Sequence, residues 1–238
     1  MKNNKIIKSL TILIIIIFLT FLFYKIFIRI EFNTYVKNTS SNLSKINYDS
    51  NIYLNMIGEN QKLNVTYSMK KSNGVVYISY KQINNDEVST NVEKYYIKEN
   101  GKIYTYIYNN SWIKNNETKI NKIFNINYNK LKYNIYNVKY LGETTIYDNK
   151  CKFYSLTMPA SAAYNLIYKK NVLSKKDINK KIKVMIYVDK KTGIISVIRY
   201  KINNINNSND NKYRFKYNLE IVNKNINNND VLKVPFEK

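Results

Sequence analysis

Long stretches of this sequence alternate between apolar and polar residues with a period of two. In NKYRFKYNLEIV, residues 211–222, one set of positions is aromatic or aliphatic and the other is basic, acidic or amide. KLNVTYSMK, residues 62–70, repeats the pattern. Successive side chains of a β-strand point to opposite faces, so this alternation is typical of antiparallel strands with one face on a core and the other in water.

Turn residues separate these runs at short distances. They are Asn73-Gly74, Asn100-Gly101, Asp148-Asn149 and a loop closed by Gly193, and glycine and asparagine tolerate the positive φ of tight turns. The pattern predicts a first set of strands at 51–58, 62–70, 74–81, 92–99 and 102–108. It predicts a second set at 136–146, 150–158, 182–189, 194–202 and 212–222.

Two segments interrupt the strands. Residues 123–135 are expected to form a helix or an irregular crossover, and a short helix is expected after Pro159, followed by a basic turn at 174–183. About ten antiparallel strands with one or two inserted helices define an α+β fold class, dominated by a curved antiparallel sheet. The concave face of such a sheet must be covered by helices or by a ligand.

The first thirty residues are different in character. Residues 9–24 carry no charge and the apolar pattern continues to Ile30, so a helix over 9–30 would span ~33 Å and match a bilayer core of about 30 Å. A cleaved signal peptide is the alternative, since Lys2, Lys5 and Lys8 form a basic start. No small residues suited to cleavage follow the apolar run, which favours an uncleaved signal anchor.

These features predict four segments. Residues 1–8 form a short basic cytoplasmic tail, 9–30 a transmembrane signal anchor, 31–48 a stalk or short helix, and 49–238 a β-rich extracytoplasmic domain. Lys25 and Arg29 follow the span and weaken the charge asymmetry, but the very short basic tail favours an inside N-terminus. The expected location is therefore the cell membrane, with one span.

Composition limits the chemistry. The chain has no histidine and a single cysteine, Cys151, so it lacks the commonest general base and cannot form a thiolate metal cluster or an internal disulfide. No catalytic motif is present, and we expect a non-catalytic protein without a metal or cofactor. Cys151 is interpreted as a small buried apolar group without a functional role.

The formal net charge is +23, which favours anionic partners such as phospholipid headgroups, a wall polymer or nucleic acid. Lysine, asparagine, isoleucine and tyrosine are abundant and are encoded by A+T-rich codons. A nucleotide bias is therefore an equal alternative explanation of the charge and the tyrosine content. A basic cluster formed by Lys169, Lys170, Lys175, Lys176, Lys180, Lys181 and Lys183 is a candidate contact for an anionic surface. A solvated loop is the commoner role for such a run.

GKIYTYIYNNSWIK, residues 101–114, places tyrosine on one face of a strand and aliphatic residues on the other. Tyr104, Tyr106, Tyr108 and Trp112 are candidate ligand-lining residues, because an aromatic ring with a polar tip suits the mouth of a lipid cavity. An aromatic core face under a helix is the commoner arrangement. If Tyr106 is a core residue, its replacement by alanine should cost about 2 to 4 kcal/mol.

Two segments carry a resemblance to a known family. YLGETTIYDNKCKFYSLTM, residues 140–158, and KVMIYVDKKTGIISVIRYKI, residues 183–202, resemble the paired hairpins of the LolA/LppX-type lipoprotein-carrier superfamily, and DVLKVPFEK resembles its C-terminal end. The resemblance implies an incomplete β-barrel, partly lidded by helices, whose concave side takes a lipid or an acyl chain. Members of that group are soluble or carry a lipidated cysteine, whereas this chain is expected to keep a protein anchor.

The expected function is therefore a membrane-anchored domain that binds a lipid or another apolar ligand in the concave face of a half-barrel. The alternative is a structural or interaction module of the cell envelope, which holds a protein partner or an anionic wall polymer through its basic surface. Nucleic acid would fit the charge and the aromatic residues, but an exported domain rarely meets it.

Overall fold

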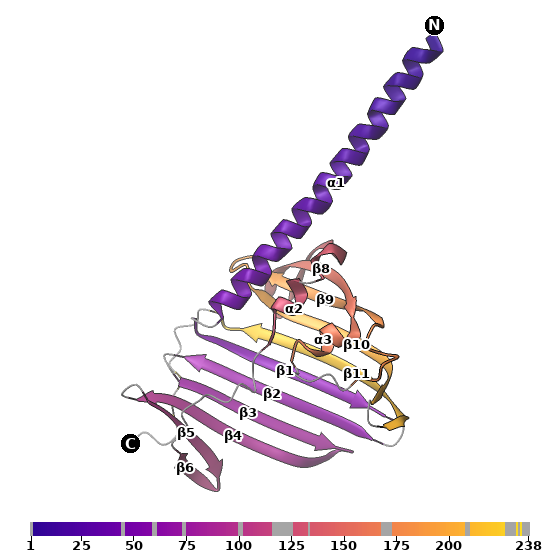
Figure 1. Cartoon of the computed structure of the whole chain (residues 1–238). Helices are drawn as coiled ribbons and strands as arrows, with labels where there is room; N and C mark the ends of the chain where they lie inside the picture. The colour runs from indigo at the N-terminus through magenta and orange to yellow at the C-terminus, as the bar shows by residue number, and fades with distance from the viewer. Residues whose placement is uncertain are drawn as a thin grey trace.

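The computed structural model describes the chain over residues 2–43, 46–58, 61–72, 75–99, 102–115, 126–132, 134–167, 173–207 and 210–226, together with 232 and 234. Its main element is an antiparallel sheet of eleven strands (Figure 1). The strands are β1 Tyr48–Ile57, β2 Lys62–Ser72, β3 Val75–Asn84, β4 Glu87–Glu99, β5 Lys102–Asn109, β6 Ser111–Asn115, β7 Val138–Ile146, β8 Asn149–Pro159, β9 Lys181–Asp189, β10 Ile195–Asn207 and β11 Asp210–Lys224.

The strand order is β6-β5-β4-β3-β2-β1-β11-β10-β9-β8-β7. Two meanders, β1 to β6 and β7 to β11, therefore join where β1 pairs with β11, and each meander ends at one edge of the sheet. The sheet does not close, since β6 and β7 lie at opposite edges. The predicted α+β class, with an open antiparallel sheet and an N-terminal apolar helix, is confirmed.

All ten predicted strands are present, and most extend by a few residues. The eleventh, β6, was not predicted; the chain reverses at Asn110, which has a positive φ of 59°, so that Tyr108 pairs with Trp112. The turn predicted at Asp148-Asn149 lies one residue earlier, at Tyr147 and Asp148, with φ of 48° and 65°. The predicted turns at Asn73-Gly74 and Asn100-Gly101 lie outside the described residues.

Helix α1 runs without a break over Lys2–Asn42. Its N-terminal part extends away from the sheet (Figure 1), and from Leu10 onward this part is exposed and apolar, long and apolar enough to cross a bilayer. Its C-terminal part packs onto the sheet. The segment expected at 31–48 lies mostly in this helix and contributes Phe32 and Val36 to the core. The expected domain bounds stay a prediction.

The C-terminal part of α1 belongs to the main hydrophobic core. Its buried apolar side chains recur every four residues, at the spacing of one helix face: Ile28, Phe32 and Val36. Leu43, directly after the helix, is buried in the same core. Thr39 is fully buried on the same face, and its Oγ1 accepts a hydrogen bond of 2.9 Å from the backbone N–H of Ile195. This contact satisfies a backbone donor at the start of β10 that would otherwise be buried without a partner.

Three short helices lie on the same face of the sheet as α1. They are α2 Asn129–Lys132, the 3-10 helix η2 Ile135–Asn137 and α3 Ala160–Tyr164, which follows Pro159 as predicted. Leu131 of α2 and Ala163 of α3 are fully buried in the main core. In the predicted basic turn, Ser174 Oγ donates a hydrogen bond of 2.7 Å to Asp177.

The core-facing side chains of the sheet follow the predicted alternation. In β11, Tyr217, Leu219 and Ile221 are buried in the main core, whereas Lys216 and Glu220 are not. A second, smaller cluster lies on the same face of the sheet, around Tyr96 of β4, with Ile103 packed against it; its buried members are Met69, Val76, Ile78 and Tyr96. The half of the sheet near β4 therefore has a thinner core.

Candidate functional site

The two faces of the sheet have different surroundings. The first, called the helix face here, packs against α1, α2 and α3 and carries the apolar core. The second, called the far face, carries the side chains that alternate with the core residues, such as Tyr53 in β1, Thr66 in β2 and Glu220 in β11, which are paired in register. The helix face is occupied by buried side chains, and a hollow that can take a ligand lies on the far face.

A hollow of about 700 Å³ lies on the far face, across β9, β10, β11, β1 and β2. Two adjacent rows of paired residues form its floor. The first row is Thr66, Tyr53, Glu220, Arg199 and Met185. The second row contains Asn64, Asn55, Asn218 and Lys201, with Lys183 beside them. Residues of five neighbouring strands therefore form the hollow.

The chemistry of the hollow is mixed. Its lining surface is mainly apolar, with the ring of Tyr53 and the thioether of Met185 among its side chains. Arg199 forms an ion pair of 2.7 Å with Glu220, which leaves the positive charges of Lys183 and Lys201 without a carboxylate partner within the hollow. A ligand that fits this lining has an apolar body and an anionic group.

The asparagine side chains form the middle of the second row. Asn55 lies between Asn64 and Asn218 in register, and its amide nitrogen donates a hydrogen bond to Asn64 Oδ1. Amide side chains can both donate and accept hydrogen bonds. They can therefore bind the oxygen atoms of a headgroup beside the two lysines.

The predicted tyrosines also lie on the far face. In β5 the buried residue is Thr105, whereas Tyr104 and Tyr106 are half-buried and Tyr108 is half-exposed on the other side of the strand. Trp112 packs against Tyr108 at 5.3 Å and edge-on against Tyr95 at 5.0 Å, measured between ring centroids. The four predicted residues are therefore brought together, but toward the β6 edge, away from the strands that form the hollow.

A lysine covers part of this aromatic cluster. Lys114 Nζ lies 3.9 Å from the ring centroid of Tyr104 and 5.5 Å from that of Tyr106. Such cation–π contacts contribute roughly 0.5–1 kcal/mol at exposed sites. The aromatic residues are therefore packed mainly against one another and against Lys114, and their role in lining a ligand site stays a prediction.

Part of the predicted basic cluster lies outside the described residues, namely Lys169 and Lys170. Lys175, Lys176, Lys180 and Lys181 are all exposed, at the turn that precedes β9 and at its start. Lys180 Nζ donates a hydrogen bond of 2.8 Å to the carbonyl oxygen of Asn203. The cluster continues into β9, where Lys183 lines the hollow, so the basic run ends at the hollow.

Sequence reasoning missed most of the hollow. Its residues come from two groups of strands that are far apart in the sequence, β1 and β2 in one group and β9, β10 and β11 in the other. The pairing of β1 with β11 brings these two groups together. The one signal was the alternation itself, because Asn64, Thr66, Asn218 and Glu220 occupy the positions between core residues. That pattern predicts a solvated face and does not reveal a hollow on it.

Cys151 and the acidic side chains are the remaining groups that could carry chemistry. Cys151 is fully buried, as predicted, with its Sγ 3.5 Å from Ser196 Oγ, and burial raises the pKa of its thiol. Within the described ranges, no three acidic or cysteine side chains come together as a metal site would require. These residues offer no reactive thiolate and no metal centre.

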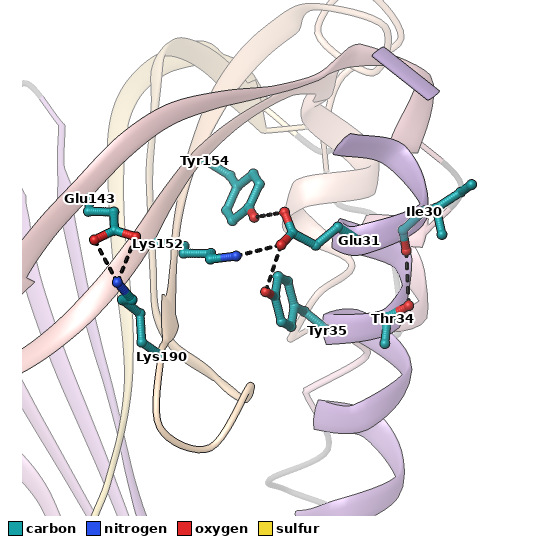
Figure 2. A network of polar contacts seen from close by, with 8 residues as sticks. All are labelled: Ile30, Glu31, Thr34, Tyr35, Glu143, Lys152, Tyr154 and Lys190. Atoms are coloured by element: carbon teal, nitrogen blue, oxygen red, sulfur yellow. Dashed lines mark hydrogen bonds and ion pairs between the residues drawn. The ribbon is translucent and has the colours of Figure 1, made fainter. Parts of the chain in front are cut away.

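A polar network joins α1 to the sheet (Figure 2). The Glu31 carboxylate accepts hydrogen bonds from the Tyr154 hydroxyl at 2.6 Å, from the Tyr35 hydroxyl at 3.0 Å and from Lys152 Nζ at 2.5 Å. Burial alone would raise the pKa of Glu31, but the hydrogen bonds from Lys152, Tyr154 and Tyr35 outweigh it and hold the pKa below its usual range. Glu31 is therefore held as a charged acceptor.

No family model matches the sequence, and no curated protein sequence is similar to it. Several solved structures are similar to this chain over most of its length. The lipoprotein LppX of Mycobacterium tuberculosis is similar over 84% of this chain and 97% of its own, with 7% identity and a TM-score of 0.45. LprF of Mycobacterium bovis is similar over 85% and 95%, with 9% identity and a TM-score of 0.46.

A LolA superfamily protein of Nitrosomonas europaea is similar over 87% of this chain and 97% of its own, with 7% identity and a TM-score of 0.28. The sequence resembles the LolA/LppX-type superfamily, and both LolA and LppX occur in the names of these similar structures. Likeness at this level transfers no ligand and no role to this chain.

Proposed function

We propose that this protein is a membrane-anchored, extracytoplasmic domain that binds an anionic lipid in the hollow of the far face, without catalysis. The hollow itself is the observation that carries the proposal. Its volume of about 700 Å³ lies within the usual range of ligand sites, which are mostly apolar with a few polar groups. Tyr53 and Met185 would contact an acyl chain, and Lys183 and Lys201 would contact the phosphate or carboxylate.

Helix α1 supports the membrane part of the proposal. Its side chains from Leu10 to Phe27 are exposed and almost all apolar, a surface that water would not favour and that lipid tails would cover. The same helix contributes Phe32 and Val36 to the core. Removal of the whole helix as a signal sequence would therefore take core residues with it, which favours an anchor that the mature protein retains.

The test is native mass spectrometry of the full chain, purified from the membrane of its own cell in a mild uncharged detergent. Replacement of Asn218 by tryptophan places a large ring in the hollow and should abolish or strongly reduce the bound phospholipid. The matched control is Asn91→Trp, because Asn91 lies exposed on the far face in β4, outside the hollow. Lipid bound around α1 is common to both variants and cancels in the comparison.

Charge variants test the headgroup contact separately. Lys183→Gln and Lys201→Gln should each weaken binding of an anionic phospholipid about fivefold, since a lysine near an anionic lipid contributes about 1 kcal/mol. Binding of a zwitterionic phospholipid should change little. Equal lipid occupancy in the parent protein, the Asn218→Trp variant and the Asn91→Trp variant would overturn the proposed function.

A second candidate function rests on the exposed lysines that precede the hollow. Lys175, Lys176, Lys180 and Lys181 are exposed together at one end of β9, and such a surface would bind an anionic wall polymer. Binding of a soluble polyphosphate would then fall steeply with salt. It would also fall in a Lys175→Gln and Lys176→Gln double variant, while lipid occupancy of the hollow stayed unchanged.

A further inference from the structure

Along helix α1, burial on the side that faces the sheet begins before the apolar surface on the opposite side ends. On the side that faces the sheet, burial begins at Ile28 and continues through Phe32 and Val36. On the opposite side, apolar exposed side chains continue to Ile30, which is 63% exposed, and the first polar exposed residue on that side is Thr34. The end of the apolar surface and the start of the domain therefore overlap.

This overlap fixes how far the domain lies from the bilayer that α1 would span. Ile28 precedes Ile30 by two residues, or ~3 Å of helix rise. If the exposed side of α1 is in contact with lipid as far as Ile30, the part of the domain that packs on Ile28 lies at the same level. Since α1 is unbroken from Lys2 to Asn42, no linker allows the domain to move away from that level.

The elements that contact α1 include α2, β7 and η2. Arg29 joins η2 to the helix at this level, because its Nη2 donates a hydrogen bond of 3.1 Å to the carbonyl oxygen of Tyr136 and its guanidinium carbon lies 5.1 Å from the centre of the Tyr136 ring. Tyr136 is nevertheless 72% exposed. Lys25 is exposed one turn before Arg29.

A tyrosine, an arginine and a lysine at the end of an apolar helix are the residues typical of a membrane–water interface, where an aromatic ring lies among headgroups and a cation reaches phosphate. The ring and the neighbouring cations fit a layer of phospholipid headgroups.

We propose that the domain rests directly on the bilayer, with Tyr136, Arg29 and Lys25 among the phospholipid headgroups. This inference depends on the membrane anchoring proposed above. It goes further, because an anchored domain on a flexible stalk would meet the membrane only by chance, whereas this one holds η2 against it permanently. The occupant of this surface is thus the headgroup layer of the membrane that α1 spans.

The test uses the full chain in vesicles of phosphatidylcholine and phosphatidylglycerol, with lipids brominated at defined depths as quenchers of tryptophan fluorescence. Trp112 is the only tryptophan of the chain and belongs to β6, at the sheet edge opposite β7, so the native protein reports on a region far from the membrane. Two further single-tryptophan variants are made in a Trp112→Phe background, Tyr136→Trp and Leu19→Trp.

The expected result is strong quenching of Tyr136→Trp by bromine close to the headgroups, deep quenching of Leu19→Trp, and no quenching of native Trp112. Addition of Arg29→Glu to the Tyr136→Trp variant should reduce its quenching at least twofold in anionic vesicles. Deep quenching of Leu19→Trp without quenching of Tyr136→Trp would overturn the docked arrangement and leave the anchor in place. Absence of quenching at Leu19 would overturn the anchor itself.

Discussion

The hydroxyl of Tyr154 in β8 donates a hydrogen bond of 2.6 Å to the carboxylate of Glu31 in α1, although 123 residues separate them in the sequence. The rings of Phe32, the next residue, and Tyr35, one turn further along the helix, pack against the same tyrosine, with centroids 5.4 Å and 6.2 Å away. The helix that emerges from the apolar segment is therefore held to the sheet by both polar and aromatic contacts. A rigid joint of this kind fixes the orientation of the domain relative to the helix axis.

Glu31→Gln should destabilise the domain by roughly 1–3 kcal/mol, because Lys152 and Tyr154 would lose a charged acceptor in a partly buried site. Thermal unfolding of the full chain in detergent, followed by near-ultraviolet circular dichroism, measures the loss. The control is Glu143→Gln. Glu143 forms a comparable ion pair with Lys190 at 2.7 Å, but both side chains are more exposed, so its loss should be below about 1 kcal/mol.

The same carboxylate predicts a pH dependence. The folded protein holds the pKa of Glu31 below its usual value of 4.5, so its contribution is fully present above that value and is lost as the pH falls through the lower, folded pKa. The stability gap between the parent protein and Glu31→Gln should thus be constant above about pH 6 and shrink below about pH 4.5. A gap that stays constant over the whole acid range would show that Glu31 contributes through packing alone.

The two phenylalanines at positions 27 and 32 of α1 test where the membrane segment ends and the core begins. Phe32 is fully buried in the main core, whereas Phe27 is 63% exposed. Phe32→Ala should cost roughly 3–5 kcal/mol in unfolding of the domain, as large-to-small changes in cores do. Phe27→Ala should leave the unfolding of the domain nearly unchanged. Equal losses of stability in the two variants would show that the domain also packs against Phe27, nearer the N-terminus of the helix.

The sheet was predictable because its signal is local. In β11 the alternation of Tyr213 to Ile221 decides both the strand and the face it buries. Helix α1 was predictable only in part, since Phe32 and Val36 stand alone among polar residues and their common helix face points to a partner that the sequence does not name. The tertiary contacts with β8 and β10 decide that this segment is helical and buried.

The candidate site was less predictable for the same reason. Lys183 was recognised as part of a basic run, but its neighbours in the hollow, Tyr53 and Asn218, become neighbours only when β1 pairs with β11. Tyr104, Tyr106 and Tyr108 were expected on one face of a strand, whereas the position of Trp112 beside them depends on β6, which was not predicted. Alternation predicts which side chains share a face of a strand, but it does not predict what packs against either face.

The tyrosine of β5 that was a candidate core residue can be tested against a true core residue of the neighbouring strand. Tyr106 is half-buried on the far face, and Tyr96 is buried on the helix face with 1% exposure. Tyr96→Ala should therefore cost roughly 3–5 kcal/mol. Tyr106→Ala should cost about 1 kcal/mol, from lost ring packing and the contact with Lys114.

Unfolding of the two variants in urea, followed by circular dichroism, gives the comparison. A loss above about 2 kcal/mol for Tyr106→Ala would show that the far face of β5 is covered in solution. Reduced lipid occupancy in Tyr106→Ala at unchanged stability would extend the ligand site from the hollow to the aromatic cluster.

Gly142 occupies a bulge in β7, where the register with β8 shifts between Tyr140 and Gly142. Its φ of +111° is a conformation that residues with a Cβ rarely adopt, yet a Cβ added there would meet no atom within 4 Å. Gly142→Ala should thus cost about 1–3 kcal/mol through backbone strain alone. Gly193 has a φ of +66° in the left-handed region, which asparagine tolerates, so Gly193→Asn should cost less than about 1 kcal/mol. Thermal unfolding distinguishes the two, and a Gly142→Ala variant as stable as the parent would mean that the bulge relaxes into a regular strand.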